Sequence, residues 1–474
     1  MAEVLIPDIC VIGAGSGGLS VAAAAAAFGV PVVLIEKAKM GGDCLNYGCV
    51  PSKALLAAAK HAAASRRVTP FGLTQQRMDV DFAKVQAHVH GVIAAIAPND
   101  SRERFAGLGV QVIEGTARFK DAATVAIGDK FEIKARRFVI ATGSSPAVPP
   151  IPGLAETPYL TNETIFELKT CPEHLIVIGA GAVGLELAQA HRRLGAKVTV
   201  LEAATPLAAE DPECAAIVLD HLAREGVILR TGVKVTRLGH TDGRIQAFIE
   251  TSHGEETIEG SNLLIAAGRR ANVDSLELEK AGIKYQRTGV AVDRGLKTSN
   301  KRAYAIGDVA GGHFTHAANE HAGIVIRNAL FRLRAKVNDE LIPRVTFTEP
   351  ELAHVGLNEA QARDRHRQIR VLRWPYHEND RAQAERETQG HIKVITAKNG
   401  RILGASIVGA QAGELINIWT LALSRGLNIR AMTGIVVPYP TLSEIGKRAA
   451  IGYFSPSLNN PRLRSLIGFL RRFG

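Results

Sequence analysis

The fold class can be inferred from the stretch "DICVIGAGSGGLSVAAAAAAFGVPVVLIEK", residues 8–37. A β-branched run leads into a glycine-rich turn, an alanine-rich stretch and a second β-branched run. Gly13, Gly15 and Gly18 permit a tight turn, close approach of the backbone to a pyrophosphate and close helix–strand packing. Glu36 follows Gly13 by 23 residues, where a carboxylate accepts hydrogen bonds from a ribose. The stretch therefore predicts a strand–turn–helix–strand unit that binds a dinucleotide on the helix N-terminus.

The same stretch has the length of a membrane span, because residues 9–35 contain 27 positions without a charge. Four glycines interrupt the run near its start, and Gly29 and Pro31 interrupt it again near its end. Since both ends are rich in β-branched residues, we expect two strands around a helix and no membrane helix.

The unit occurs a second time, as "HLIVIGAGAVGLELAQAHRRLGAKVTVLE" at residues 174–202, with glycines at 179, 181 and 184. Two such units predict two bound dinucleotides, FAD and a nicotinamide nucleotide. Glu202 ends the second unit, and its carboxylate accepts a 2′-hydroxyl but repels a 2′-phosphate. No arginine pair follows in "EAATPLAAED". We therefore predict a preference for NAD(H) over NADP(H).

Composition limits the class of protein. The chain has 474 residues, enough for two to four domains at roughly 150 residues each. Its five cysteines are too scattered for a disulfide-stapled secreted protein, and its N-terminus lacks the features of a signal peptide. The net charge of +11 comes from basic residues interspersed with acids. We expect a cytoplasmic protein that handles anionic dinucleotides and binds no nucleic acid.

A close cysteine pair lies in "GGDCLNYGCVPSKAL", residues 41–55. Cys44 and Cys49 could form a structural disulfide, half of a zinc site or a redox pair. The zinc interpretation lacks a second cysteine or histidine pair at suitable spacing, and no metal-ligating set is predicted. Pro51 suits the first turn of a helix, so Cys49 is expected just ahead of a helix N-terminus, which favours its thiolate. We interpret the two cysteines as a redox pair.

Several motifs of the chain, taken together, resemble those of the FAD-dependent pyridine nucleotide–disulfide oxidoreductases. They are "GGDCLNYGCVPSK", both glycine fingerprints, "ATG" at 141–143, "AAGRR" at 266–270 and "GD" at 307–308. This family includes dihydrolipoamide dehydrogenase, glutathione reductase and mercuric reductase. The resemblance implies an α/β fold with two Rossmann-like domains and a C-terminal α+β dimerisation domain. It places the FAD domain at 1–149 and 276–342, the NAD(P) domain at 150–275 and the dimerisation domain at 343–474.

The resemblance also implies roles for individual residues. Cys49 would contact the flavin and Cys44 would face the substrate. Lys53 would lie near the flavin ring and pair with Glu186. The cofactor contacts it implies are Gly13, Gly15, Ser16, Gly18, Glu36, Lys37, Gly42, Asp43, Cys44, Lys53, Gly115, Ala117, Thr142, Gly143, Ser144, Gly179, Gly181, Val183, Gly184, Glu186, Glu202, Val235, Gly268, Asp308, His316 and Ala317.

One position departs from the disulfide-reducing members of the family. They carry a His-Pro-Thr motif whose histidine, oriented by a glutamate, is lent by the partner subunit. This chain reads "VVPYPTLSEIGKRAA" at 436–450, with Tyr439 at the histidine position and Glu444 at the glutamate position. A tyrosine, with a pKa of about 10, moves protons poorly at neutral pH compared with a histidine at about 6.5. We therefore expect impaired exchange with ordinary disulfides.

Mercuric reductases share this tyrosine, and "SSPAVPPIPGLAETPYLTNET" at 144–164 also resembles that branch. Those enzymes usually carry a C-terminal cysteine pair, whereas no cysteine follows Cys214 here. The leading hypothesis is a homodimeric enzyme that passes electrons from NADH through FAD and Cys44–Cys49 to a metal ion or a non-standard disulfide. The alternatives are a dihydrolipoamide dehydrogenase and, in a different class, a flavoprotein redox sensor without substantial turnover.

The last segment, "NPRLRSLIGFLRRFG", predicts a basic amphipathic helix. It places Leu463, Leu466, Ile467, Leu470 and Phe473 on one face, with arginines around them. Packing on the dimer itself is the interpretation favoured by the sequence, and contact with an anionic membrane surface is the alternative.

Overall fold

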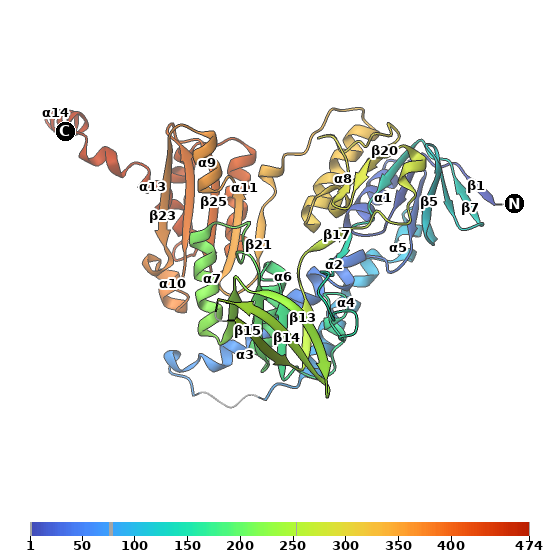
Figure 1. The fold of residues 1–474 in the computed structure, drawn as a ribbon. Coiled ribbons are helices and arrows are strands. Elements are labelled where there is room, and N and C mark those ends of the chain that lie inside the picture. Colours follow the sequence, from blue (N-terminus) through green and yellow to red (C-terminus); the bar gives the residue numbers. More distant parts are fainter. Residues whose placement is uncertain (1, 75–78, 253, 474) are drawn as a thin grey trace. The chain divides into compact units, whose positions relative to one another are not determined.

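The computed structural model describes residues 2–74, 79–252 and 254–473. Contacts divide the chain into two compact units, which are described separately (Figure 1). The first unit comprises Met1–Ala203 with Leu229–Asn338, and the second comprises Ala204–Ile228 with Asp339–Gly474. Parallel sheets flanked by helices build the first unit, so the α/β class expected from the sequence is confirmed.

The first fingerprint lies at the centre of a five-stranded parallel sheet. Its central strand, β2 (Ile9–Ile12), forms hydrogen bonds with β3 (Val32–Glu36) on one side and with β8 (Arg137–Ile140) on the other. Ile9 lies opposite Val32 and Arg137. The strand order is β20 (Ala303–Ala305), β8 (Arg137–Ile140), β2 (Ile9–Ile12), β3 (Val32–Glu36) and β4 (Val110–Glu114). The uncharged run thus forms β2, α1 (Ser16–Ala27) and β3, as predicted. Among the described helices, none is long and apolar enough to cross a membrane.

The second fingerprint builds a second sheet in the same way. β10 (His174–Ile178) runs parallel to both β11 (Lys197–Glu202) and β16 (Asn262–Ile265). α6 (Ala182–Arg193) follows the glycine turn. The order is β12 (Val227–Thr231), β11 (Lys197–Glu202), β10 (His174–Ile178) and β16 (Asn262–Ile265). All five side chains of β10 are buried, as expected for a parallel strand covered on both faces.

Smaller elements complete the first unit. Its minor sheets are β1 (Glu3–Leu5), β7 (Phe131–Ile133), β6 (Thr124–Ile127) and β5 (Ala117–Asp121); β13 (Lys234–Thr241), β14 (Arg244–Thr251) and β15 (Gly254–Gly260); β17 (Arg269–Ala271) with β9 (Ser144–Pro146); and β18 (Tyr285–Gln286) with β19 (Gly289–Val290). Its other helices are α2 (Gly42–Asn46), α3 (Cys49–Arg66), η1 (Thr69–Phe71), α4 (Phe82–Ile96), η2 (Ala97–Asp100), α5 (Arg102–Gly107), η3 (Ile165–Glu167), η4 (Leu278–Ala281), η5 (Gly307–Ala310) and α8 (Thr315–Ala329). The division of this unit into FAD and NAD(P) domains stays a prediction.

The second unit is an antiparallel sheet with helices. The strand order is β21 (Arg344–Thr346), β22 (Glu351–Gly356), β25 (Ile402–Gly409), β24 (His391–Ala397) and β23 (Ile369–Pro375). Its helices are α7 (Pro212–Arg224), η6 (Asp339–Leu341), α9 (Glu359–Arg365), η7 (Tyr376–Glu378), α10 (Asp380–Glu385), α11 (Ala412–Ser424), α12 (Ile429–Gly434), α13 (Glu444–Gly452), η8 (Ser455–Asn459) and α14 (Pro461–Leu470). Trp419 of α11 lies in the core of this unit with only 1% of its surface exposed.

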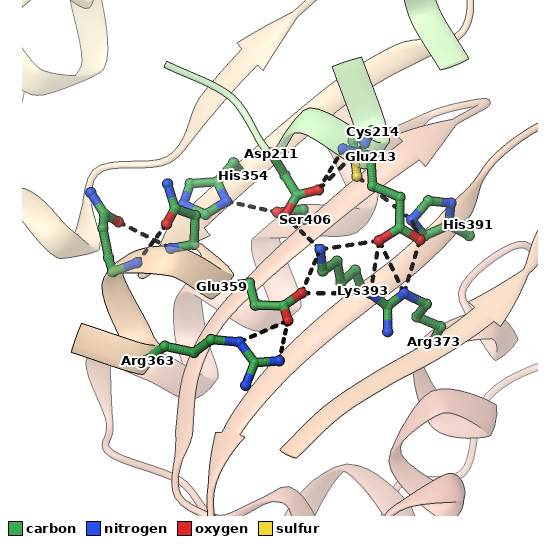
Figure 2. A network of polar contacts seen from close by, with 12 residues as sticks. Asp211, Glu213, Cys214, His354, Glu359, Arg363, Arg373, His391, Lys393 and Ser406 are labelled. Carbon is green, nitrogen blue, oxygen red and sulfur yellow. Dashed lines mark hydrogen bonds and ion pairs between the residues drawn. The ribbon is translucent and has the colours of Figure 1, made fainter. Parts of the chain in front are cut away.

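A polar cage joins α7 to this sheet (Figure 2). Ile392 and Val394 of β24 belong to the apolar core, so Lys393 between them points to the opposite face. There its side chain is only 5% exposed, and its ammonium group lies 2.8 Å from Asp211, 3.1 Å from Glu213 and 2.9 Å from Glu359. Residues 204–228 are thereby held within the second unit, although the sequence places them inside 150–275.

Candidate functional site

The two glycine turns have the geometry that a dinucleotide requires. Gly13 has φ of +105°, and a Cβ there would lie 2.4 Å from the Ala141 carbonyl oxygen. A Cβ on Gly18 would lie 1.9 Å from the Gly13 carbonyl oxygen, so only glycine lets α1 pack this closely on β2. The middle glycine, Gly15, has open space instead, its nearest neighbour being 4.0 Å away at Gly42. The open space at Gly15 can accommodate the pyrophosphate group of a dinucleotide.

The second turn repeats this arrangement. A Cβ on Gly179 would lie 2.4 Å from the Ala266 oxygen, and one on Gly184 would lie 2.1 Å from the Gly179 oxygen. At Gly181 there is nothing within 4 Å. The chain's residues therefore fit a dinucleotide at each of the two sites.

An acidic residue ends the strand beside each turn, as the spacing predicts. The Glu36 carboxylate accepts a hydrogen bond from the Ala14 N–H at 2.6 Å. The Glu202 carboxylate accepts one from the Ala180 N–H at 2.7 Å. Each carboxylate thus lies directly at its glycine turn, in a position to meet a ribose.

The cysteine pair lies where α2 passes into α3. Cys49 is the first residue of α3, one position further into the helix than the sequence suggests, and Cys44 lies on the preceding short helix. Both are free thiols; Cys49 is exposed and Cys44 is half-buried. The Cys49 sulfur lies 3.5 Å from the hydroxyl of Thr315, the first residue of α8.

The two thiols have different acidities. The hydrogen bond from Cys44 lowers the pKa of Cys49 to about 6, assisted by the Thr315 hydroxyl and the Lys53 ammonium group. The same contact, together with burial, raises the pKa of Cys44. At neutral pH the reduced pair therefore holds one thiolate, on Cys49, and one proton, on Cys44.

Lys53 is fixed by the pairing that the resemblance implies. Its ammonium group donates to the Glu186 carboxylate at 2.8 Å, and Glu186 has 6% of its side chain exposed. Lys53 lies one turn after Cys49 on α3, and Glu186 lies on α6 behind the second glycine turn. The pair therefore connects the cysteine helix to the helix of the second nucleotide unit.

An arginine that sequence reasoning missed organises the polar groups beside the cysteines. Arg269 lies 3.2 Å from Asp43 and 3.6 Å from Asp308. Its Nε donates to the Ser144 hydroxyl at 2.7 Å, and that hydroxyl donates to Asp308. Arg269, the first arginine of "AAGRR", therefore holds three predicted cofactor residues in place: Asp43, Ser144 and Asp308. Thr315 was missed as well, because "THAANEHAG" carries no local sign of contact with a cysteine 266 residues away.

The other predicted cofactor residues lie at the ends of strands and helices in the first unit. Ser16 begins α1, Lys37 follows β3, Gly42 begins α2, Gly115 follows β4, Ala117 begins β5, Thr142 and Gly143 follow β8, Val183 lies on α6, Val235 lies on β13, Gly268 precedes β17, and His316 and Ala317 lie on α8. The His316 ring stacks on Phe314, with ring centres 5.3 Å apart. Their contacts with a cofactor stay predictions.

Tyr439, at the expected acid/base position, is not hydrogen-bonded to Glu444, the residue expected to orient it, but to another carboxylate. Tyr439, in the second unit, has 70% of its surface exposed, and its hydroxyl donates to Asp380 at 2.6 Å. Asp380 raises the pKa of the Tyr439 hydroxyl. Glu444, expected to orient position 439, accepts hydrogen bonds from Arg448 at 2.9 and 3.1 Å.

Two family models together match most of the chain. The family model described as "Pyridine nucleotide-disulphide oxidoreductase" matches residues 7–323. The model for the dimerisation domain of the same family matches residues 342–450.

Individual relatives cover nearly the whole chain. A mercuric reductase of Staphylococcus aureus is 35% identical over 94% of this chain and 82% of its own. A dihydrolipoyl dehydrogenase of Thermus scotoductus is 36% identical over 92% of this chain and 95% of its own. A similar solved structure is the Cu(II) complex of the HOCl-induced flavoprotein disulfide reductase RclA from Escherichia coli. It superposes on this chain with a TM-score of 0.84 and is 29% identical in sequence. The match covers 95% of this chain and 99% of the RclA chain.

Proposed function

The chain belongs to the pyridine nucleotide–disulphide oxidoreductase family, and from that premise we propose that it takes electrons from NADH and delivers them to a metal ion through Cys44 and Cys49. The observation that carries the proposal is the asymmetric thiol pair beside Lys53 and Thr315. A structural disulfide requires no such difference in acidity, whereas a redox pair uses it to separate a thiolate from a proton-bearing thiol.

Bound FAD would supply the two-electron chemistry that links a nicotinamide to the cysteine pair. The two electrons break the Cys44–Cys49 bond. Cys49 is left as the thiolate, stabilised by Thr315 and Lys53, and Cys44 takes up a proton. Cys44 is then the thiol that meets the acceptor, while Cys49 stays next to Lys53. Arg269 holds Asp43 and Asp308, so the groups around the pair keep their positions as the charge changes.

The proposed nicotinamide is NADH. Glu202 supports it, because its carboxylate lies at the second glycine turn, where a 2′-phosphate would meet a like charge.

The proposed acceptor is a metal cation, with a non-standard disulfide as the other possibility within the same mechanism. The family's dimerisation domain is present at 342–450, and we propose that each subunit lends Tyr439 to the cysteine pair of its partner. Because the Tyr439 proton is donated to Asp380, the phenol oxygen presents lone pairs beside a carboxylate. Such a surface favours a cation over a neutral disulfide that needs a proton. The relatives named mercuric reductase and the Cu(II) complex of RclA support this class of acceptor.

The second candidate is dihydrolipoyl dehydrogenase activity, favoured by the 36% identity to such an enzyme. Tyr439 argues against it, since that chemistry needs a group that exchanges protons at neutral pH. In either case the proposed location is the cytoplasm, where an exposed thiol pair stays reducible.

The proposal is tested by anaerobic turnover of the FAD-loaded protein with NADH and Hg(II) or Cu(II), in parallel with Cys44→Ser and Cys49→Ser variants. We expect each variant to lose at least about a hundredfold of the turnover while still allowing NADH to reduce the flavin. Unchanged metal-ion turnover in both variants would remove the cysteine pair from the mechanism.

A further inference from the structure

The C-terminal segment carries a helix that its own chain leaves uncovered. After α13, the short η8 leads into α14, and every described residue from 455 to 473 is exposed. Figure 1 shows α14 extending away from the five-stranded sheet of its unit. The helix exposes six large apolar side chains: Leu463, Leu466, Ile467, Phe469, Leu470 and Phe473. Six such side chains within eleven residues form an exposed apolar patch, and a patch of this kind often marks a site of interaction.

The helix is amphipathic. With a turn of about 100° per residue, Leu463, Ile467 and Leu470 share one face, and Leu466 lies beside them. Arg464 and Arg471 lie along one edge of that face, and Arg472 lies on the opposite side of the helix. Arginines beside an apolar face can keep their charged ends in water or at headgroups while their stems cover apolar surface.

The charge of this region has one sign. No aspartate or glutamate follows Glu444 in the sequence, whereas two basic residues of α13 and four arginines of the tail do. The family's dimerisation model ends at residue 450, before η8 and α14 begin. The tail therefore lies outside the segment by which this family is known to pair, and its charge calls for an anionic partner.

A basic hollow lies next to the residue at which the tail begins. A hollow of about 490 Å³ is lined by Arg363, His366, Arg367, Gln368, Ile369, Arg370 and Lys398. Arg363 is paired with Glu359. Asp364, an exposed acid on α9, is outnumbered by these cations. The hollow is thus a polar, cationic depression open to solvent.

Tyr453, the residue that follows α13, fixes the tail to this hollow. Its hydroxyl donates to the Lys398 carbonyl at 2.6 Å, and its own carbonyl accepts from Arg370 at 2.9 Å. The Arg370 guanidinium also lies 4.4 Å from the centre of the Tyr453 ring. The hollow and the start of the tail therefore form one continuous basic region of the second unit.

We propose that α14 and this hollow together bind the surface of an anionic lipid membrane. The apolar face enters the boundary between headgroups and acyl chains, the arginines along its edge meet lipid phosphates, and the hollow receives further headgroups. Apolar side chains alone would suit many partners, but the combination with a predominantly basic region, in which no acid follows Glu444, selects an anionic bilayer. The sequence favoured packing on the dimer; the end of the dimerisation domain at 450 and the charge of the region favour the membrane.

The test is sedimentation of the FAD-loaded full-length protein with vesicles of phosphatidylcholine, with and without a quarter of phosphatidylglycerol. We expect binding to the mixed vesicles and little to the neutral ones, with weakening at high salt. Arg464→Gln with Arg471→Gln should lower the partition constant by about 25-fold, since each basic side chain near such a surface contributes about fivefold. Arg367→Gln with Lys398→Gln should lower it by a similar factor.

Leu466→Asn with Leu470→Asn should abolish the part of binding that persists in high salt. The matched control is Arg287→Gln with Lys301→Gln, which removes the same charge from exposed positions of the first unit and should leave binding unchanged. All variants should keep the wild-type rate of NADH oxidation without vesicles. Equal binding to neutral and anionic vesicles, or equal loss in the control, would overturn the proposal. So would a change from dimer to monomer mass in the leucine variant, because the face would then be a contact between subunits.

Discussion

Tyr439 donates its hydroxyl proton to Asp380 across 2.6 Å, while Glu444 is engaged by Arg448. The tyrosine is therefore held as a hydrogen-bond donor to a carboxylate, which raises its pKa and keeps it from acting as an acid at neutral pH. On this relationship rests our proposal that the acceptor is a cation and not an ordinary disulfide.

Replacement of this tyrosine should move the acceptor preference. We expect Tyr439→His to raise lipoamide turnover by roughly a hundredfold, the usual contribution of a positioned acid/base group. Turnover with Hg(II) should not rise. Steady-state NADH formation from dihydrolipoamide measures the first effect, and Tyr439→Phe is the control that removes the hydroxyl without adding a titrating group. Lipoamide turnover that stays unchanged in Tyr439→His would show that this position does not set the preference.

The acidity of Cys49 gives a direct prediction. In the NADH-reduced protein, alkylation by iodoacetamide should rise with a midpoint at about pH 6, because the thiolate is the reacting form. Thr315→Val and Lys53→Met should each move the midpoint upward, since each removes a group that stabilises the thiolate. Thr236→Val, which removes a hydroxyl from β13, should not. A midpoint near 9 in the wild type would contradict the assigned hydrogen bonds; mass spectrometry identifies the labelled cysteine.

The cage around Lys393 predicts how the second unit responds to acid (Figure 2). The Arg373 guanidinium and the Lys393 ammonium group hold the pKa of Glu213 down at about 2, well below the usual 4.5 of a glutamate. Because the folded-state pKa is the lower one, this contribution to stability is present above about pH 4.5 and is lost as the pH falls toward 2. Glu213→Gln should therefore flatten the fall in stability across that range. Both tryptophans, Trp374 and Trp419, lie in the second unit, so tryptophan fluorescence in urea reports its unfolding.

Replacement of Lys393 should lower the stability of the second unit more than replacement of Glu213. Burial alone would lower the pKa of Lys393, but hydrogen bonds to Asp211, Glu359 and Glu213 raise it above its usual value. Lys393→Met leaves these carboxylates facing one another, and should reduce the free energy of unfolding by about 3–5 kcal/mol. The control is Arg224→Met, which breaks an exposed pair with Asp220 and should cost less than about 1 kcal/mol. A similar loss in both variants would show that burial of the cage adds nothing.

The nicotinamide preference rests on Glu202. We expect Glu202→Ala to lower the ratio of kcat/KM for NADH to that for NADPH by about tenfold or more, because a like-charge repulsion is removed from the 2′-phosphate. Glu250→Ala, which removes the same charge from an exposed position of β14, should leave the ratio unchanged. A wild type that prefers NADPH would contradict the assignment.

The elements that the sequence predicted well are those with a local cause. Both glycine turns, the helices that follow them and the strands that end at Glu36 and Glu202 lie where the spacing placed them. In each case the constraint lies within one short segment: a Cβ at Gly18 or Gly184 would clash with the turn itself. The predicted tail helix is also present, as α14.

The contacts that the sequence did not reveal join distant segments. Thr315 reaches Cys49 from 266 residues away, and Asp380 meets Tyr439 across 59 residues. Such pairs depend on how whole elements pack, for which a single sequence gives no periodic signal. The assignment of α7 to the second unit has the same origin, since it rests on the cage formed with Lys393 of β24.

The electron acceptor can be identified by following reoxidation of the reduced flavin. The FAD-loaded protein is reduced anaerobically with NADH and then mixed separately with Hg(II), Cu(II), lipoamide and glutathione disulfide, while reoxidation of the flavin is followed. We predict fast reoxidation by a metal ion, dependent on Cys44 and Cys49, and slow reoxidation by both disulfides. Fast reoxidation by lipoamide in the wild type, with Tyr439 in place, would contradict this prediction.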